Sequence, residues 1–347
     1  MEPASETGVN IHMRADRGVA TVTGVEGVRP FDSASPLVYI HTTLYAHSTG
    51  SPVRYKGLLL ALTLTIASLR AFPQEQGVRK EGVCLFPGNA LFAPLPASPE
   101  EPRVGLRREF GSMRMRLDIG ASYDILGYNP ASDTSAHFRV GADLFAYALT
   151  TSYQGLHLQV DAVDGYFGGH VIYLHQRPAS FTLLRLRILH LSSHLIDGHF
   201  RLETKTWLDG QLPRPYSRDY AEATAAYSWG GARWSAVLYA GFLHAWFVRP
   251  DNMTRFNTFQ GVLARTSQWI GPLWGTPVNL YVADHFMLSG VDKLSGSNTL
   301  EGGVKFGEWS GGGMKLYVSY HTGMEIYHQY YDVKRSDVGI GFALDVW

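Results

Sequence analysis

The sequence has few cysteines, few charges and no hydrophobic run long enough to span a membrane, and each shortage excludes a class of protein. A single cysteine among 347 residues leaves no internal disulfide framework and no cysteine-based zinc cluster. Charged residues make up 17%, below the ~25% that is usual in soluble domains. The 30 basic residues balance the 30 acidic ones, which excludes the basic excess of an obvious nucleic-acid binder. A mean hydropathy of −0.08 excludes a polytopic helical membrane protein.

Glycine and aromatic residues are abundant instead. The chain contains 37 Gly, 19 Tyr and 8 Trp, and aromatic residues account for 13% of it. Together with few charges and middling hydropathy, this composition is typical of β proteins. A β-barrel in a bacterial outer membrane fits it best.

One short segment resembles a secretory signal. Arg54 and Lys56 form a basic start, and residues 57–69 form an apolar run that is too short to span a bilayer as a helix. The small residues Ala67, Ser68 and Ala71 offer cleavage points. A buried core helix is the alternative interpretation. We assign residues 53–71 to a signal peptide and expect export on this basis.

The flanking regions are expected to lie outside the folded unit. Residues 1–52 are polar and lack periodicity, so we expect a disordered or non-native extension, with translation starting at Val53. Residues 72–102 become Pro-rich, and proline at that density does not fit a strand. We expect this segment to be a periplasmic lead-in to the barrel.

After Pro102 the hydrophobic pattern alternates with period two, which predicts strands. In 314–322 and in 183–188, mainly aliphatic residues occupy one face and polar or charged residues the other. A soluble sandwich turns its polar face to water, whereas a membrane barrel turns aliphatic residues to lipid and charges to its lumen. We predict one antiparallel transmembrane barrel over 103–347. Its twelve strands are expected near 103–110, 114–126, 137–149, 165–175, 181–194, 221–228, 232–247, 257–268, 278–288, 298–306, 313–323 and 336–347.

Both the connections and the C-terminus fit this topology. The connections alternate between short ones, such as 229–231, and longer polar ones, such as 195–219. The terminal Trp347 is typical of strands that the outer-membrane assembly machinery recognises, although the aliphatic residues of this strand have the other parity. We expect outer-membrane lipids and that machinery as partners, and no nucleic acid.

Three segments resemble domain-of-unknown-function family 1207, a set of predicted outer-membrane barrels. They are Leu95–Arg103, His190–Asp197 and the tail from His321 to Trp347. The second is similar to a His-x-Ser-Ser-His-Leu-Gly-Asp-Glu signature, with Ile196 in place of the glycine and Gly198 in place of the acidic residue. The resemblance covers about 84–347 and implies a fold and a location, but no activity.

Inside the second segment, His190 and Ser192 share a strand face with the aliphatic row. They are therefore expected to point to lipid near the outer end of the barrel. This facing is similar to that in outer-membrane phospholipase A and lipid A deacylase, where a histidine activates a serine that attacks a lipid ester. The alternative is a strand end that contacts lipid headgroups.

Catalysis of this kind needs a third group to orient the imidazole. Glu203 faces Ser192 if residues 199–208 form a hairpin with a two-residue loop, and Thr204 faces His190 if that loop has three residues. His194, on the same face as Ser192, is another candidate. If 195–219 is one external loop, neither pairing forms.

The opposite parity predicts a charged lumen. Its expected lining residues are Arg114, Arg116, Arg185, Arg187, Glu301, Lys305 and Lys315. The functions left open are a structural or binding barrel of unknown activity, which we favour, a lipid-ester hydrolase, and a narrow small-solute pore. No compact metal-ligand spacing or phosphate-binding loop is present in the sequence, so no metal and no cofactor is expected.

Overall fold

The computed structural model describes residues 15–16, 19–20, 81–88, 90–153, 156–196, 200–201, 203–207, 212, 214–231, 233–267 and 269–346. The expected signal peptide, almost all of the expected extension over 1–52, and Trp347 lie outside these residues and stay predictions. The chain divides into two compact units, Met1–Pro73 and Gln74–Trp347. In the first unit, β1 (Ala15–Asp16) pairs antiparallel with β2 (Val19–Ala20).

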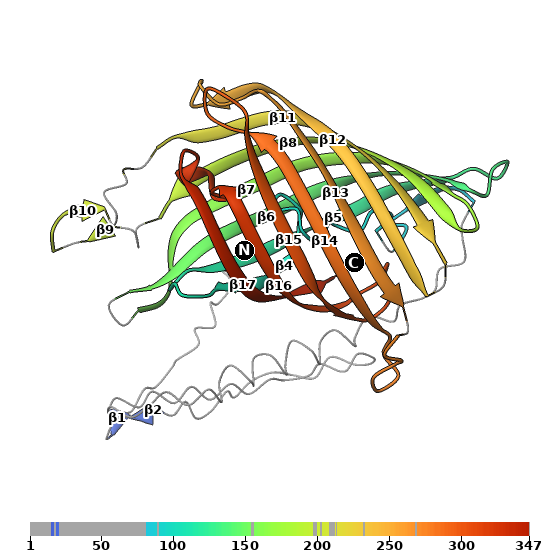
Figure 1. The fold of residues 1–347 in the computed structure, drawn as a ribbon, viewed down its shortest axis with the longest axis horizontal. Coiled ribbons are helices and arrows are strands. Elements are labelled where there is room, and N and C mark those ends of the chain that lie inside the picture. Colours follow the sequence, from blue (N-terminus) through green and yellow to red (C-terminus); the bar gives the residue numbers. More distant parts are fainter. Residues whose placement is uncertain are drawn as a thin grey trace, which may run out of the picture. The chain divides into compact units, whose positions relative to one another are not determined.

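The second unit is built almost entirely of strands (Figure 1). The twelve strands expected from the sequence are all present, and several extend further than the alternation predicts. They are β4 (Val104–Glu109), β5 (Met115–Asn129), β6 (Ala136–Tyr153), β7 (Leu156–Gln176), β8 (Ser180–Leu195), β11 (Tyr216–Gly230), β12 (Trp234–Arg249), β13 (Phe256–Ser267), β14 (Val278–Ser289), β15 (Ser295–Phe306), β16 (Gly313–Met324) and β17 (Lys334–Asp345). The smaller elements are β3 (Gly82–Leu85), β9 (Phe200–Arg201), β10 (Thr206–Trp207) and the 3-10 helix η4 (His328–Tyr330).

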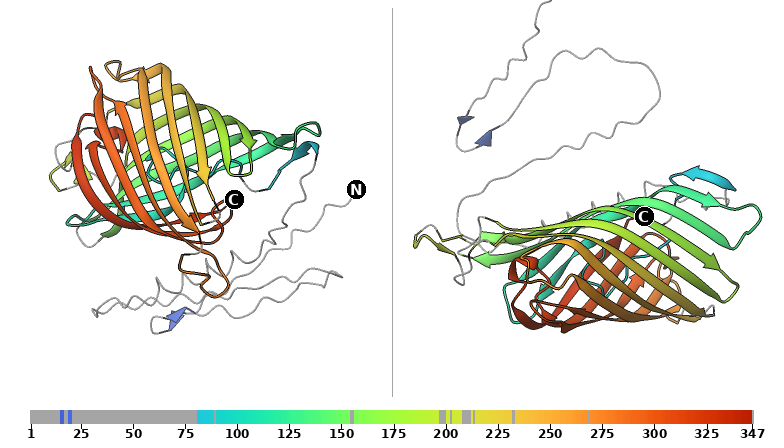
Figure 2. Two further views of the ribbon diagram at one scale, coloured as in Figure 1. Left: turned by 45° about the vertical axis from the view of Figure 1, so that its right-hand side comes forward. Right: turned by 90° about the horizontal axis from the view of Figure 1, so that it is seen from above.

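The sheet closes on itself. Each of the twelve strands pairs antiparallel with its neighbours, β17 returns to pair with β4, and β4 continues through β5 to β6. The strands run obliquely round the barrel (Figure 2). Closure satisfies the backbone groups that an open edge would leave exposed to lipid. The remaining strand of the sheet, β3, adds to the far end of β5.

The two faces of the barrel differ as a membrane protein requires. On β16, Leu316 and Val318 are 46% and 49% exposed, whereas Lys315 and Ser319 are 7% and 4% exposed. The same alternation recurs on β8 and β17, so the exposed outer surface is aliphatic and aromatic while the charged side chains are enclosed. A water-soluble sandwich would show the reverse. The chain is therefore an integral membrane β-barrel of the outer-membrane type, as its alternation predicts.

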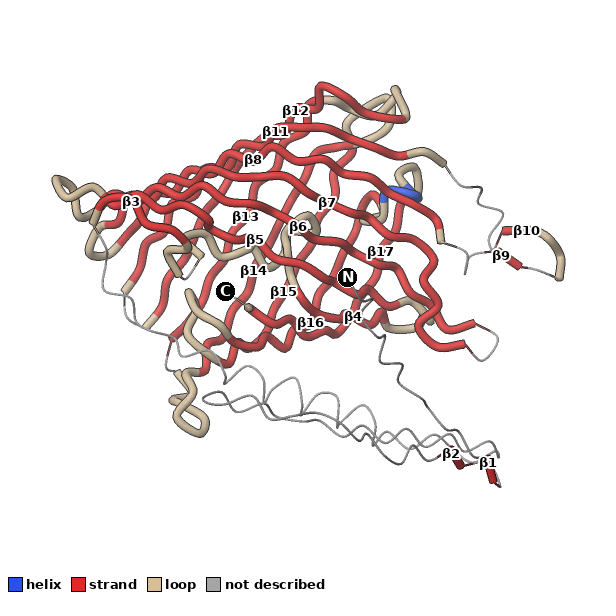
Figure 3. The backbone as a smooth tube through the Cα atoms, turned by 180° about the vertical axis from the view of Figure 1, so that it is seen from behind, coloured by secondary structure: helices blue, strands red, loops and turns tan. Residues whose placement is uncertain are grey.

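The barrel has two distinct ends (Figure 3). The connections after β7, β11 and β15 lie at the turn end, where β4 begins and β17 finishes. Those after β8, β12 and β16 lie at the opposite, loop end, which includes η4. Among the described residues, no helix is long and apolar enough to cross a membrane.

Two apolar clusters fill much of the interior. The turn-end cluster joins wall residues of β7 to β17 with Phe92, Leu95 and Ala97 from the Pro-rich segment. The loop-end cluster joins wall residues of β6, β7, β8, β11 and β12 with Tyr327 and Tyr330, which come from the connection between β16 and β17. Each cluster is thus completed by a segment that is not part of the wall.

Candidate functional site

The Pro-rich segment lies inside the barrel. Within it, Leu95, Glu100 and Glu101 are 5%, 7% and 1% exposed. The expectation of a periplasmic lead-in is therefore corrected for the described residues 90–102. Proline prevents this segment from joining a strand ladder, but its side chains and free carbonyl groups still bind the wall.

Two adjacent carboxylates anchor the segment to arginines of the wall. Arg185 on β8 makes two hydrogen bonds to Glu101, one of them 3.0 Å long from Nη1 to Oε2. Nη2 of Arg187 lies 3.4 Å from Oε1 of Glu101. Arg218 on β11 donates to Glu100 over 2.9 Å. These charges can remain buried because each has an opposite charge within hydrogen-bonding or ion-pairing distance.

A carboxylate of the wall completes this anchor. Glu222 on β11 accepts from Arg187 at 3.0 Å and 2.6 Å and from Arg185 at 3.2 Å. Three arginines of the wall therefore meet two carboxylates of the segment and one of the wall. We call these six side chains the Arg–Glu anchor: Arg185, Arg187, Arg218, Glu100, Glu101 and Glu222.

Further contacts hold the segment before and after this anchor. The Leu91 amide donates to Asp124 over 3.0 Å, and Phe92 lies 4.0 Å beneath the Arg185 guanidinium. Arg103, at the entry to β4, donates to Glu301 over 3.2 Å. The segment is thus fixed on several sides of the barrel.

All seven residues expected to line the lumen have partners inside the barrel. Arg116 pairs with Asp118, and Arg114 contacts Glu109 at 3.3 Å and Glu325 at 2.6 Å. Lys305 and Lys315 share one carboxylate, Asp345, at 2.6 Å and 2.8 Å. The remaining three, Arg185, Arg187 and Glu301, hold the Pro-rich segment. These charges are thus joined in ion pairs with other side chains inside the barrel.

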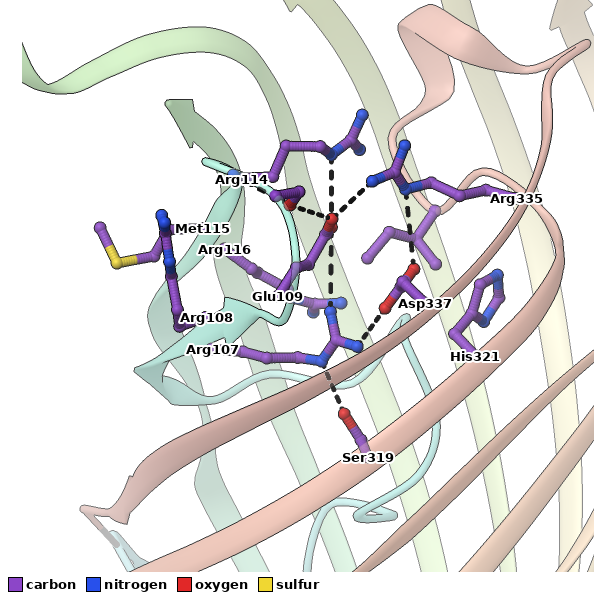
Figure 4. A network of polar contacts seen from close by, with 12 residues as sticks. Arg107, Arg108, Glu109, Arg114, Met115, Arg116, Ser319, His321, Arg335 and Asp337 are labelled. Carbon is purple, nitrogen blue, oxygen red and sulfur yellow. Dashed lines mark hydrogen bonds and ion pairs between the residues drawn. The ribbon is translucent and has the colours of Figure 1, made fainter. Parts of the chain in front are cut away.

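A polar network crosses the seam where β4 meets β17 (Figure 4). Glu109 of β4 accepts from Arg335 of β17 over 2.7 Å and from Arg114 over 3.3 Å. Arg107 donates to Ser319 of β16 over 2.6 Å and also binds Asp337 of β17. The backbone pairing between β4 and β17 is limited by the short length of β4, and these side-chain contacts reinforce it.

The connection between β16 and β17 folds into the loop end. Nδ1 of His328 lies 2.7 Å from Asp164, and the Gln329 amide donates to the Ser193 carbonyl over 2.8 Å. Arg214, in the connection before β11, binds Asp332 at 2.8 Å and 3.0 Å. The hydrogen bond from Arg214 lowers the pKa of Asp332 below its usual value. Two connections that are distant in sequence are thus tied together at this end.

On the outer face, the structure places His190 and Ser192 as expected. Both belong to the outward row of β8 with Leu186 and Ile188, while Leu189 and Leu191 between them are buried. The Phe167 ring lies 4.7 Å from the His190 ring. Among the described residues, no hydrogen bond joins Ser192 to His190, so general-base chemistry needs this hydrogen bond to form when substrate binds.

The group that orients His190 is Asp219 on β11. Its Oδ1 lies 2.5 Å from His190 Nδ1, and the two residues are direct partners in the strand register. The side chains are 31% and 35% exposed, so the pair lies at the surface of the barrel. A carboxylate on Nδ1 leaves Nε2 available, which is the arrangement that a general base requires.

None of the three candidates proposed from the sequence has this position. Glu203 lies in the turn between β9 and β10, and Thr204 bonds Thr206 over 2.7 Å. Residues opposite Ser192 are Gly165 and Ser217 instead. The chain between β8 and β11 forms neither of the expected pairings, in agreement with the alternative that treats 195–219 as one external loop. His194 is exposed at the end of β8.

Across the described residues, no group of three or more His, Cys, Asp or Glu side chains is arranged to hold a metal ion.

Comparison with known proteins gives no family, because no family model and no curated protein matches the chain. Solved structures similar to it include the Pseudomonas putida toluene transporter TodX, at 9% identity and TM-score 0.36, covering 67% of this chain and 69% of that one. The CymD monoaromatic hydrocarbon channel is similar at 6% identity and a TM-score of 0.35, covering 69% of this chain and 74% of that one. OmpT of Vibrio cholerae, an outer membrane protein, is similar at 9% identity and a TM-score of 0.28, covering 73% of this chain and 99% of that one. The barrel described above stands on the chain's own register and on the facing of its side chains.

Proposed function

We propose that this chain is an outer-membrane protein whose barrel is sealed by its own Pro-rich segment, and that it acts by binding at the membrane surface. The observation that carries this proposal is the Arg–Glu anchor, which holds Glu100 and Glu101 inside the barrel. The exposed aliphatic belt supports the membrane location. A narrow solute pore is disfavoured because the interior charges are paired with one another.

Conductance across a planar lipid bilayer tests the seal. Wild-type protein should show little current. The double variant Glu100→Gln and Glu101→Gln keeps the shape of both side chains but removes the charges that bind the arginines. Breaking a buried pair costs about 3 kcal/mol, which corresponds to roughly a hundredfold shift toward the open state. More frequent or longer openings are therefore expected.

The matched control is Glu308→Gln, because Glu308 is exposed in the connection between β15 and β16. It removes a carboxylate without touching the segment, so its current should equal that of wild type. A steady large current through the wild type would contradict the seal. Equal low currents in the folded double variant would show that the two carboxylates do not hold it.

A second candidate function is lipid-ester hydrolysis on the outer face. It is favoured by Asp219, which supplies the orienting carboxylate that a serine–histidine mechanism needs. In this mechanism His190 takes the proton from the Ser192 hydroxyl, and the serine oxygen attacks the ester carbonyl carbon. The alcohol then leaves with that proton, and water releases the acid from the enzyme.

Fatty-acid release from phospholipid and lipid A by folded protein in detergent tests this candidate. If the mechanism holds, Ser192→Ala lowers the rate by about 10³-fold or more. Ser336→Ala, an exposed serine on β17, is the control and should leave the rate unchanged. Absence of release by wild type with both lipids would remove the hydrolase and leave the sealed barrel standing.

The remaining expectations from the sequence belong to this proposal. Export through the segment 53–71, recognition of the last strand by the assembly machinery, and a relationship to domain-of-unknown-function family 1207 would each fit a barrel of this type. The segment Leu95–Arg103, on which part of that resemblance rests, contains Glu100 and Glu101 of the Arg–Glu anchor.

A further inference from the structure

The outer face carries a hollow of about 640 Å³ that spans β7 to β13. Small outward residues form its floor, namely Ala223 and Ala225 on β11 and Ala240 on β12. Ala225 and Ala240 are direct register partners, so the floor is continuous across both strands. Leu184 and Leu186 of β8 border one side and Phe242 of β12 borders the other. We call this feature the alanine trough.

The outward row that forms the floor of the trough continues to the polar pair described above. Toward the loop end, the outward row of β11 continues from Ala225 and Ala223 to Ala221 and then to Asp219. His190 is the partner of Asp219 on β8, one step beyond Ile188 in the outward row. From Ala223, the last floor residue, to Asp219 the strand rises about 13 Å, at ~3.3 Å per residue. The lining of the apolar trough stops at Ala223 on β11, and the outward row continues from there to the level of a histidine whose Nε2 has no bonding partner among the described residues.

We infer that the alanine trough is a binding site for one acyl chain of a membrane ester lipid, whose ester carbonyl accepts a hydrogen bond from His190. The aliphatic belt around the trough places acyl chains against it, which determines the chemistry of the occupant. The inferred contact uses both ring nitrogens of His190: Nδ1–H donates to Asp219, and Nε2–H donates to the carbonyl oxygen. This inference rests on the proposed membrane location and does not require hydrolysis.

The shape of the surface explains why one chain would be held here in preference to its neighbours. On β16, by contrast, the outward row carries bulky side chains, such as Leu316 and Val318. A chain lying on such a row touches protein on one side alone. In the alanine trough it touches the floor and both borders, so it gains more dispersion contacts.

Photocrosslinking in lipid vesicles tests the site. Protein is folded into vesicles of phosphatidylethanolamine and phosphatidylglycerol that contain a trace of phosphatidylethanolamine with a diazirine in one acyl chain. After illumination, the crosslinked residues are mapped by mass spectrometry. Wild type should be labelled several-fold more on the outward residues of β8, β11 and β12 than on those of β16 and β17.

Ala223→Phe fills the trough from an outward position, so the interior of the barrel is unchanged. It should abolish the excess labelling. Val318→Phe adds an aromatic ring at an outward position without a trough and should leave the excess in place. Heat-modifiable migration on gels shows that all variants are folded.

An ether-linked probe that lacks the ester carbonyl separates the two parts of the site. With this probe, much of the excess labelling of wild type should be lost, because the probe has no ester carbonyl to accept a hydrogen bond from His190. For the same reason, His190→Gln should change the labelling by the ether probe little. Even labelling around the whole barrel, or an excess that Ala223→Phe does not reduce, would overturn the inference. Retained labelling without hydrolysis would reject the hydrolase alone.

Discussion

The two faces of β8 use the same strand in opposite ways. Its inward arginines, Arg185 and Arg187, are almost fully buried and bind carboxylates from both β11 and the Pro-rich segment. Its outward row is aliphatic until His190, which has one charged partner, Asp219, and remains about one-third exposed. Polar groups within the barrel are enclosed by several partners, whereas the outer pair keeps one bonding position free. The inner face therefore stabilises the fold, whereas the outer face has a hydrogen-bonding position that is available to a ligand.

The comparison predicts the largest loss of stability inside the barrel. Glu222→Gln should lower the free energy of unfolding by about 3–5 kcal/mol, because it leaves Arg185 and Arg187 with one carboxylate fewer in a buried site. Urea unfolding in lipid vesicles, followed by tryptophan fluorescence, measures the change. A loss below 1 kcal/mol would mean that water reaches the Arg–Glu anchor.

The outer pair should contribute much less to stability. Asp219→Asn should change the free energy of unfolding by less than about 1 kcal/mol in the same measurement, because the pair is partly exposed and its charges are screened. Its effect should appear in ligand binding, as reduced crosslinking of the ester probe. A loss as large as that of Glu222→Gln would show that the two faces do not differ in the way described.

The smallest effect is expected at the tie between Arg214 and Asp332. Because the pKa of Asp332 is lowered in the folded protein, this tie stabilises the loop end fully at pH values above the ordinary aspartate pKa of ~3.9. The stabilisation is lost as the pH falls through the lowered pKa. Hydrogen exchange over residues 325–333 should be faster in Asp332→Asn than in wild type at pH 6. The difference should disappear once the pH falls below the lowered pKa of Asp332. A difference that persists there would assign the protection to other contacts.

Alternation in the sequence predicted the strands, and the signal-like segment together with the abundant aromatic residues favoured a membrane barrel over a soluble sandwich. A row such as Leu316, Val318 and Tyr320 opposite Lys315 and Ser319 predicts a strand with two distinct faces, because a period of two gives only two faces. The Pro-rich segment has no period, so its place inside the barrel depends on arginines that come much later in the chain. Charge offered one signal: Glu100 and Glu101 are adjacent, and the lumen is rich in arginine.

The third member of the outer site could not be predicted for a related reason. Glu203 was favoured because it follows Ser192 closely in sequence, but the chain leaves the barrel after β8 and returns only at Tyr216. The pairing of His190 with Asp219 depends on the length of that excursion, which the sequence pattern does not determine. Its signal was Asp219 itself, an acidic residue in the otherwise small, uncharged row of Ser217, Ala221, Ala223 and Ala225.

The position of the Pro-rich segment constrains the order in which the molecule is assembled. The segment directly precedes β4, which is the first strand of the barrel and also the partner of the last strand. Its binding residues Arg185, Arg187 and Arg218 belong to strands made later. A ring that had already closed would have to admit this segment through one of its ends. The curved sheet can instead collect the segment while β17 is still free, so that forming the β4–β17 seam encloses it. Pairing of β4 with β17 would then close the barrel and enclose the Pro-rich segment in the same step.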